Sequence, residues 1–133
     1  MLSDVQRNEL VSAAQSAAES AYSPFSKYRV GASVLCSNGK IYSGCNVENS
    51  SYGLTICAER VAVFKAVSSG ERIVKAVCVA TPDDESGSMC GACRQVVNEF
   101  IDENCEVVYV GRSGKVRSVL FRTLLPEPFR LKT

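Results

Sequence analysis

The sequence predicts an α/β protein of three layers, α-β-α, with a five-stranded mixed sheet in the middle. Segments of helical periodicity alternate with apolar runs of strand length along the chain. In order they predict a helix, a β-hairpin, a helix, a strand, a helix and two strands, with parallel strands wherever a helix intervenes. No linker, repeat or low-complexity tract interrupts the 133 residues, so a single domain over residues 1–133 is expected.

The first helix is predicted over residues 4–22. Ser3 and Gln6 have the spacing of a capping box, and leucine and alanine residues follow at helical spacing. The small alanine side chains allow close packing on a sheet or on another helix. Pro24 is expected to end the helix, because proline has no amide hydrogen and restricts the residue before it.

A β-hairpin is predicted next, with strands at residues 28–36 and 40–46. Asn38 and Gly39 lie between them and form the dipeptide that best suits a two-residue type I′ turn.

A buried helix is predicted over residues 57–67. Apolar residues cover nearly every side of it, Thr55 is placed to cap its start, and Gly70 suits the position just after its end.

The remainder of the chain predicts a strand, a helix and two strands. Residues 73–80 are apolar except for Lys75, as expected of a strand that is covered on both faces. Four apolar residues mark a helix that begins near Cys90, namely Val96, Val97, Phe100 and Ile101. The last two strands are predicted over residues 107–110 and 116–120.

The composition argues against several classes of function. Fifteen Lys and Arg residues against fourteen Asp and Glu residues give a net charge of +1, so no strong field attracts nucleic acid or anionic lipid. A basic C-terminal stretch is expected to be solvated or to make subunit contacts; it contains Arg112, Lys115, Arg117, Arg122, Arg130 and Lys132. No targeting segment and no run of about 18 apolar residues is present. A cytoplasmic protein with no membrane or nucleic-acid partner is therefore expected.

The chain has seven cysteines and no histidine. An odd number of cysteines without a secretion signal argues against a disulfide framework. The lack of histidine excludes Ser-His-Asp, Cys-His and H-E-x-x-H chemistry, and it leaves Cys, Asp and Glu as the strong zinc ligands. Any hydrolysis must therefore use a carboxylate to carry protons.

Two short segments, Cys57-Ala58-Glu59-Arg60 and Cys90-Gly91-Ala92-Cys93-Arg94, offer three thiols and one carboxylate. A C-x-x-C pair alone also occurs in redox and iron–sulfur sites. The third cysteine, followed two residues later by a glutamate, favours the zinc site of nucleobase deaminases, in which the glutamate is not a ligand. Both segments open predicted helices, whose N-termini lower cysteine pKa values.

Three alternatives remain open for these thiols: a catalytic zinc site with an open position, a closed structural zinc site, and a redox dithiol. A closed site needs a fourth ligand. The four other cysteines lie in or beside predicted strands among apolar neighbours, where free cysteine usually fills the core; they are Cys36, Cys45, Cys78 and Cys105. This favours the open catalytic site.

Three charged residues lie beside the thiols. Glu59 could merely complement the helix dipole, but its place between a candidate ligand and a buried helix face favours a role in proton transfer. Three thiolates on Zn²⁺ sum to a net charge of −1, which makes the metal a weaker Lewis acid than a three-histidine zinc. Arg60 and Arg94 are placed to donate hydrogen bonds to the sulfurs; an ion pair elsewhere is the alternative, and it is favoured for Arg94.

Motifs along nearly the whole chain resemble those of the short, three-cysteine, homotetrameric cytidine deaminases. Besides the two cysteine segments they are Ser23-Pro24-Phe25-Ser26, Val30-Gly31-Ala32, Gly44-Cys45-Asn46-Val47-Glu48-Asn49 and Leu124-Leu125-Pro126, in the same order. The resemblance implies the fold of that family and hydrolysis of cytidine and 2′-deoxycytidine to uridine and 2′-deoxyuridine plus ammonia, in pyrimidine salvage. It also implies one Zn²⁺ per chain, held by Cys57, Cys90 and Cys93. Glu59 would take a proton from zinc-bound water, pass it to N3 and later protonate the departing amine, while hydroxide attacks C4.

The resemblance further assigns six residues to substrate binding: Phe25, Asn46, Glu48, Tyr52, Ala58 and Phe129. Asn46 and Glu48 would bind the ribose 3′-hydroxyl, where a carboxylate repels a 3′-phosphate. Phe25 would lie against the pyrimidine. Tyr52 and Phe129 would come from neighbouring subunits of the homotetramer. From the residues alone, the segment 46–49 could instead be a surface turn and Phe25 a core residue.

Met89 departs from the family signature, which has proline before this cysteine. Proline at a helix start fixes φ near −65°, so methionine is expected to make the loop less rigid while zinc binding survives.

Two rival functions stay open. One is deamination of another aminopyrimidine compound, such as blasticidin S or a base in a polynucleotide. The other is a zinc-stabilised binding module that uses the basic C-terminal stretch. The segment Asn46-x-Glu48-Asn49 and the lack of a basic face favour a nucleoside substrate.

Overall fold

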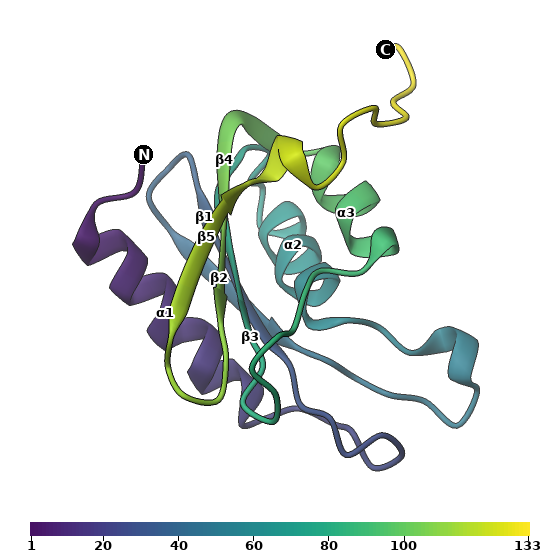
Figure 1. Cartoon of the computed structure of the whole chain (residues 1–133). Helices are drawn as coiled ribbons and strands as arrows, with labels where there is room; N and C mark the ends of the chain where they lie inside the picture. Colours follow the sequence, from purple (N-terminus) through teal and green to yellow (C-terminus); the bar gives the residue numbers. More distant parts are fainter.

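The structure, a computed structural model, describes residues 1–133. Helix α1 (Asp4–Ala18) covers one face of a single sheet, and α2 (Ala58–Ser68) and α3 (Gly91–Asn98) cover the other face (Figure 1). The predicted α/β class and the three-layer arrangement are therefore confirmed. None of the helices is long and apolar enough to cross a membrane.

The sheet has five strands in the order β2-β1-β3-β4-β5. Their bounds are Gly31–Cys36 (β1), Ile41–Cys45 (β2), Val74–Ala80 (β3), Ile101–Val110 (β4) and Val116–Leu120 (β5). The pair β3 and β4, which α3 connects, is parallel, and every other neighbouring pair is antiparallel. The predicted mixed sheet is thus confirmed. Two short 3₁₀ helices, Tyr52–Leu54 and Phe121–Thr123, complete the elements.

The central strand β3 is buried on both faces, as its apolar sequence predicted. Val77 and Val79 belong to the larger core beneath α2 and α3. Cys78 and Ala80 belong to the smaller core beneath α1. This alternation follows from the two-residue period of a strand.

Helix α1 has the predicted capping box at Ser3, but it ends at Ala18 and not near residue 22. The chain leaves the helix early because Tyr22 bonds to a distant loop. Its amide donates to the carbonyl of Asn46 at 3.0 Å, and its own carbonyl accepts from Glu48 N at 2.8 Å. These long-range bonds outweigh local helix propensity.

The hairpin is present, with strands shorter than predicted, but its turn is not the expected two-residue type I′ turn. Gly39 has φ 86°, whereas Asn38 has no positive φ. The amide of Gly39 donates to Cys36 O, and the amide of Cys36 donates to Lys40 O, both at 2.9 Å. This is a three-residue loop, in which a type I turn is followed by a left-handed glycine. Asn38 instead uses its side chain, which bonds to Lys40 N and to Glu71.

Helix α2 begins differently from the prediction. Cys57 is its N-cap residue, and the hydroxyl of Thr55 accepts a hydrogen bond from Asn49 N at 3.1 Å. Thr55 therefore stabilises the preceding loop and does not cap the helix.

Helix α3 and strand β4 also differ in length from the prediction. The helix ends at Asn98, so Phe100 and Ile101 lie beyond it, and Ile101 already begins β4. The prediction missed the first half of β4 because residues 102–104 are polar and largely exposed, which hides the strand pattern.

Gly31 is the point where α1 lies closest to the sheet. A Cβ at this position would overlap the carbonyl oxygen of Ala14 and lie 2.6 Å from Ala18 N. We expect Gly31→Ala to lower the free energy of unfolding by about 3 kcal/mol, because helix backbone must move away from β1. Chemical denaturation measures this.

Gly53→Ala is the matched control, since a Cβ there meets no atom within 4 Å. Equal stability of the two variants would contradict the close approach of α1.

Candidate functional site

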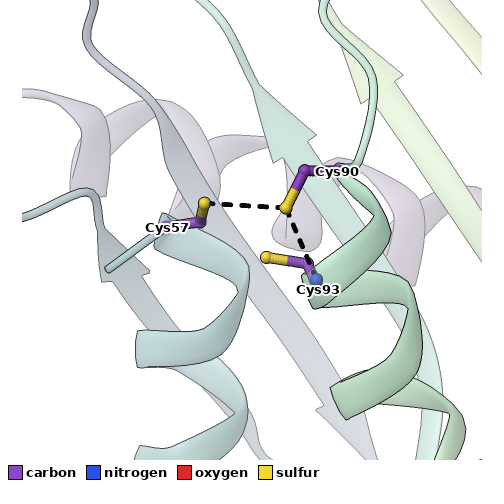
Figure 2. A group of neighbouring side chains, drawn as sticks. All are labelled: Cys57, Cys90 and Cys93. Carbon is purple, nitrogen blue, oxygen red and sulfur yellow. Dashed lines mark hydrogen bonds between the residues drawn. The ribbon is translucent and has the colours of Figure 1, made fainter. Parts of the chain in front are cut away.

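Three sulfur atoms converge at the N-termini of α2 and α3 (Figure 2). Cys57 and Cys90 are the N-cap residues of the two helices, and Cys93 lies in the first turn of α3. The three Sγ atoms lie within 4.8 Å of one another, and those of Cys57 and Cys90 are 3.8 Å apart. A tetrahedral zinc with Zn–S bonds of about 2.3 Å requires sulfur atoms about 3.8 Å apart. The cluster is thus positioned to bind one metal ion.

The backbone at each helix start aims the thiols at this point. Cys57 (ψ 153°) and Cys90 (ψ 164°) have the extended conformation of N-cap residues, so each side chain projects beyond the end of its helix. The amide of Cys93 donates to Cys90 Sγ at 3.4 Å. Both helix N-termini therefore favour the thiolate form that binds metal.

Hydrogen bonds among the thiols and Arg60 favour thiolate at Cys57. The pKa of Cys57 is lowered to about 5, first by its hydrogen bond with Cys93 and then by Arg60. The same bond, together with burial, raises the pKa of Cys93. The Arg60 guanidinium donates to Cys57 Sγ at 3.4 Å, as predicted. A metal ion at this point would favour the thiolate form of these cysteines.

Within the chain, Arg94 donates no hydrogen bond to a sulfur atom and makes no ion pair. Its guanidinium donates to the carbonyl oxygens of Met89 at 2.8 Å and Leu124 at 2.9 Å, and to the hydroxyl of Ser88 at 3.2 Å. Arg94 therefore fixes the loop that leads into Cys90.

No fourth thiol joins the cluster. Cys36, Cys78 and Cys105 are buried in strands, Cys45 is partly exposed at the end of β2, and all are free. The group of potential metal ligands contains only Cys57, Cys90 and Cys93. A closed site of four cysteines from one chain is therefore excluded.

Glu59 is a buried carboxyl next to this cluster. It lies in the first turn of α2, and only 4% of its surface is exposed. Burial raises the pKa of Glu59 to about 7. A carboxyl with a pKa near neutrality can both accept and release a proton.

Two of the thiols and Glu59 open into a cavity of about 410 Å³, a size common for small-molecule sites. Cys57, Cys90 and Glu59 line it together with Asn46 and Glu48. The structure therefore joins the candidate metal site to two of the predicted substrate-binding residues.

A second hollow of about 390 Å³ continues from this cavity and shares Glu48 with it. Phe25 and Tyr52 line this hollow, with their ring centres 5.8 Å apart in an edge-to-face arrangement. Phe25 is 46% exposed and is not a core residue.

Glu48 and Asn46 are held in place by backbone groups of neighbouring loops. Glu48 accepts hydrogen bonds from Phe25 N at 2.9 Å, from Ser26 N at 3.1 Å and from the Ser26 hydroxyl, and these bonds lower its pKa, that of the hydroxyl most. Asn46 accepts from Val30 N at 2.9 Å and donates to Tyr28 O at 2.8 Å. Only 8% of Asn46 is exposed, whereas Val47 and Asn49 of the same segment are exposed.

Ala58 and Phe129 lie outside both hollows. Ala58 is fully buried at the start of α2. Phe129 is 68% exposed in the C-terminal tail, where its carbonyl accepts a hydrogen bond from Gln95. Within one chain, the structure does not bring these two residues to the cavity.

Sequence analysis did not single out several cavity-lining residues. Tyr28, Thr81 and Ser88 line the cavity. Tyr28 falls in a predicted strand, and Thr81 and Ser88 lie in a loop whose sequence carries no periodic pattern. Ser26 lies inside one of the quoted motifs, and this placement is the one signal that could have identified it.

Comparisons with known proteins agree with this geometry. Residues 4–110 match the family model described as the cytidine and deoxycytidylate deaminase zinc-binding region. A cytidine deaminase of Sporosarcina psychrophila is 44% identical over 126 residues, which cover 95% of this chain and 91% of the relative.

Solved structures of cytidine deaminases also match this chain over most of its length. The crystal structure of a cytidine deaminase from Burkholderia pseudomallei matches with a TM-score of 0.86 and 43% identity, over 92% of this chain and 98% of that one. The enzyme from Mycobacterium tuberculosis matches with a TM-score of 0.82 and 37% identity, over 96% and 100% of the two chains.

We expect Cys90→Ser to abolish stoichiometric zinc binding, because two thiols cannot hold the ion at an otherwise open site. Elemental analysis of dialysed protein should give about one zinc per chain for the wild type and almost none for the variant. Cys45→Ser is the control, since Cys45 lies outside the cluster. Full zinc occupancy in the Cys90 variant would contradict this assignment.

Proposed function

The chain belongs to the cytidine and deoxycytidylate deaminase family, and we propose that it hydrolyses cytidine and 2′-deoxycytidine to uridine and 2′-deoxyuridine, with release of ammonia. One observation carries the proposal: two thiols of the three-cysteine cluster, Cys57 and Cys90, and the buried Glu59 line the same cavity as Asn46 and Glu48. A metal site, a proton carrier and polar groups for a sugar thus surround one small-molecule space. The 133 residues are proposed to act as a single domain.

Cys57, Cys90 and Cys93 are the proposed ligands of one Zn²⁺. When bound, the ion supplies a Lewis acid that lowers the pKa of water at its open position. Arg60 donates a hydrogen bond to Cys57 Sγ and offsets part of the negative charge of three thiolates.

Glu59 is the proposed proton carrier. Its carboxylate takes a proton from the attacking water and delivers it to N3 of the pyrimidine. Glu59 then takes the proton of the hydroxyl group newly formed on C4 and gives it to the amine, so that the C4–N bond breaks as the C4=O bond forms while N3 keeps its proton. Its burial suits both steps, because a carboxyl with a pKa near 7 returns the proton as readily as it takes it.

Substrate recognition is assigned to the polar and aromatic residues around the cavity. Asn46 keeps one amide hydrogen free after its bonds to residues 28 and 30, and this hydrogen is available for the ribose 3′-hydroxyl. Glu48 is held ionised beside it, so a 3′-phosphate would meet like charge. Phe25 is proposed to lie against the pyrimidine ring, and buried Ala58 to act only through its backbone.

We further propose a homotetramer that acts in the cytoplasm and shares its sites between subunits. Large apolar side chains are strongly exposed on the single chain, among them Tyr52 (75%), Phe64 (48%) and Phe129 (68%). Tyr52 and Phe129 are the residues proposed to complete neighbouring sites. The cytoplasm keeps thiols reduced, as zinc binding by three cysteines requires.

We expect Glu59→Gln to lower kcat for cytidine by about 10²- to 10⁴-fold or more, because glutamine cannot carry the proton. The loss of cytidine absorbance by zinc-loaded protein measures this. Zinc content and stability should stay at wild-type values, and Glu99→Gln, at an exposed site, is the matched control. Activity of Glu59→Gln within about tenfold of wild type would refute the assigned role.

Glu48→Gln tests sugar recognition. Glutamine keeps an oxygen that can accept from Phe25 N and Ser26 N but removes the charge. We expect KM for cytidine to rise about tenfold with little change in kcat, and discrimination against cytidine 3′-phosphate to fall. Steady-state kinetics with both compounds measures this. An unchanged preference would argue against contact between Glu48 and the 3′ position.

A further inference from the structure

Met89 precedes the ligand Cys90 at the position where the deaminase signature has proline. Unlike proline, methionine brings a backbone N–H, and this group is buried at a site where it needs a partner. The structure provides one: Met89 N donates to the hydroxyl oxygen of Tyr109 at 3.2 Å.

The Met89 residue is held at three points. Its amide bonds to Tyr109, its carbonyl oxygen accepts from Arg94 Nε at 2.8 Å, and its side chain is 2% exposed in the larger core. Arg94 is itself tied to the carbonyl of Leu124. The backbone immediately before Cys90 is therefore fixed to two different parts of the fold.

Tyr109 is a rigid anchor for this contact. It lies near the C-terminal end of β4, paired with Val79 of β3 and Arg117 of β5. Its side chain is 4% exposed, and the Arg117 guanidinium lies 4.2 Å from the centre of its ring. The hydroxyl oxygen is thus placed by the sheet itself and not by a loop.

Cys90 needs such support more than the other two thiols do. It is the exposed member of the cluster and the N-cap of a helix of only eight residues. Helix α3 fixes its C-terminal side, and the loop that contains Met89 fixes its N-terminal side.

We propose that Tyr109 is a positioning residue for the metal centre. Its hydroxyl holds the Met89 amide and thereby keeps Cys90 in its ligating position, a restraint that the proline ring provides in the family signature. This inference rests on the zinc site of the proposed function and is independent of the substrate.

Tyr109→Phe removes only the hydroxyl. We expect Zn²⁺ to leave the variant about tenfold faster than the wild type, because the restraint on a ligand is lost. The rate is measured by mixing the purified, zinc-loaded protein with an excess of a chromogenic chelator and following the transfer of zinc to the chelator. Tyr42→Phe is the matched control, since Tyr42 is a partly buried sheet residue whose hydroxyl bonds to no other residue; it should release zinc at the wild-type rate.

A double-mutant cycle separates positioning from a general structural effect. In the Met89→Pro background the amide is absent, so adding Tyr109→Phe should leave zinc release unchanged or make it slower. Equal acceleration in both backgrounds would overturn the proposal, because the tyrosine would then act without Met89.

Amide hydrogen exchange provides a readout that does not depend on the proline variants. The Met89 amide should be protected in the wild type and exchange at least about tenfold faster in Tyr109→Phe. Equal protection, or zinc release at the wild-type rate, would overturn this inference and leave the proposed function intact. A wild-type chain that binds no zinc would overturn both.

Discussion

The rest of this structure depends on one constraint: the N-termini of two helices must lie close enough together to bring three sulfur atoms to one point. Thiolates 3.8 Å apart repel one another unless positive charge faces them. Here the ends of α2 and α3 and the Arg60 guanidinium provide positive charge, and a metal ion bound at the cluster would add to it. Both helices must therefore pack on the same face of the sheet with their first turns together, as Figure 2 shows.

The sheet makes this arrangement possible through close packing. Beneath α2, Gly44 of β2 leaves room for the helix, since a Cβ there would lie 2.8 Å from Ala62 N. Alanines at 58, 62 and 66 let the helix lie deep in the core, where all three are buried. The same depth removes Glu59 from water and raises its pKa toward neutrality. The burial of the first turn of α2 thus accounts both for the close packing of the helix and for the raised pKa of Glu59.

Loops complete the cavity, and hydrogen bonds to backbone amides hold them in place before any substrate arrives. Glu48 fixes residues 25–26, and Asn46 fixes residues 28–30. The loop that leads to Cys90 is tied to the rest of the fold by Arg29, whose guanidinium lies 2.8 Å from Asp83, and by Glu85, which accepts from Ser113. These contacts reduce the ordering that substrate and metal must otherwise impose.

Local sequence determined the element types, the capping box at Ser3 and the two segments that carry the thiols and Glu59, because periodicity and motif spacing are properties of the chain itself. It did not determine where α1 ends, how the hairpin turns or where β4 begins, since each depends on partners far away in the sequence. The same holds for the two arginines. Arg94 directly follows Cys93 and Arg60 lies three residues after Cys57, yet only Arg60 donates to a sulfur atom, while Arg94 donates to the carbonyl oxygens of Met89 and Leu124. Tertiary structure alone decided this, and it also placed the Tyr109 hydroxyl against Met89, because side-chain direction and the pairing of β3 with β4 arise only when the sheet has formed.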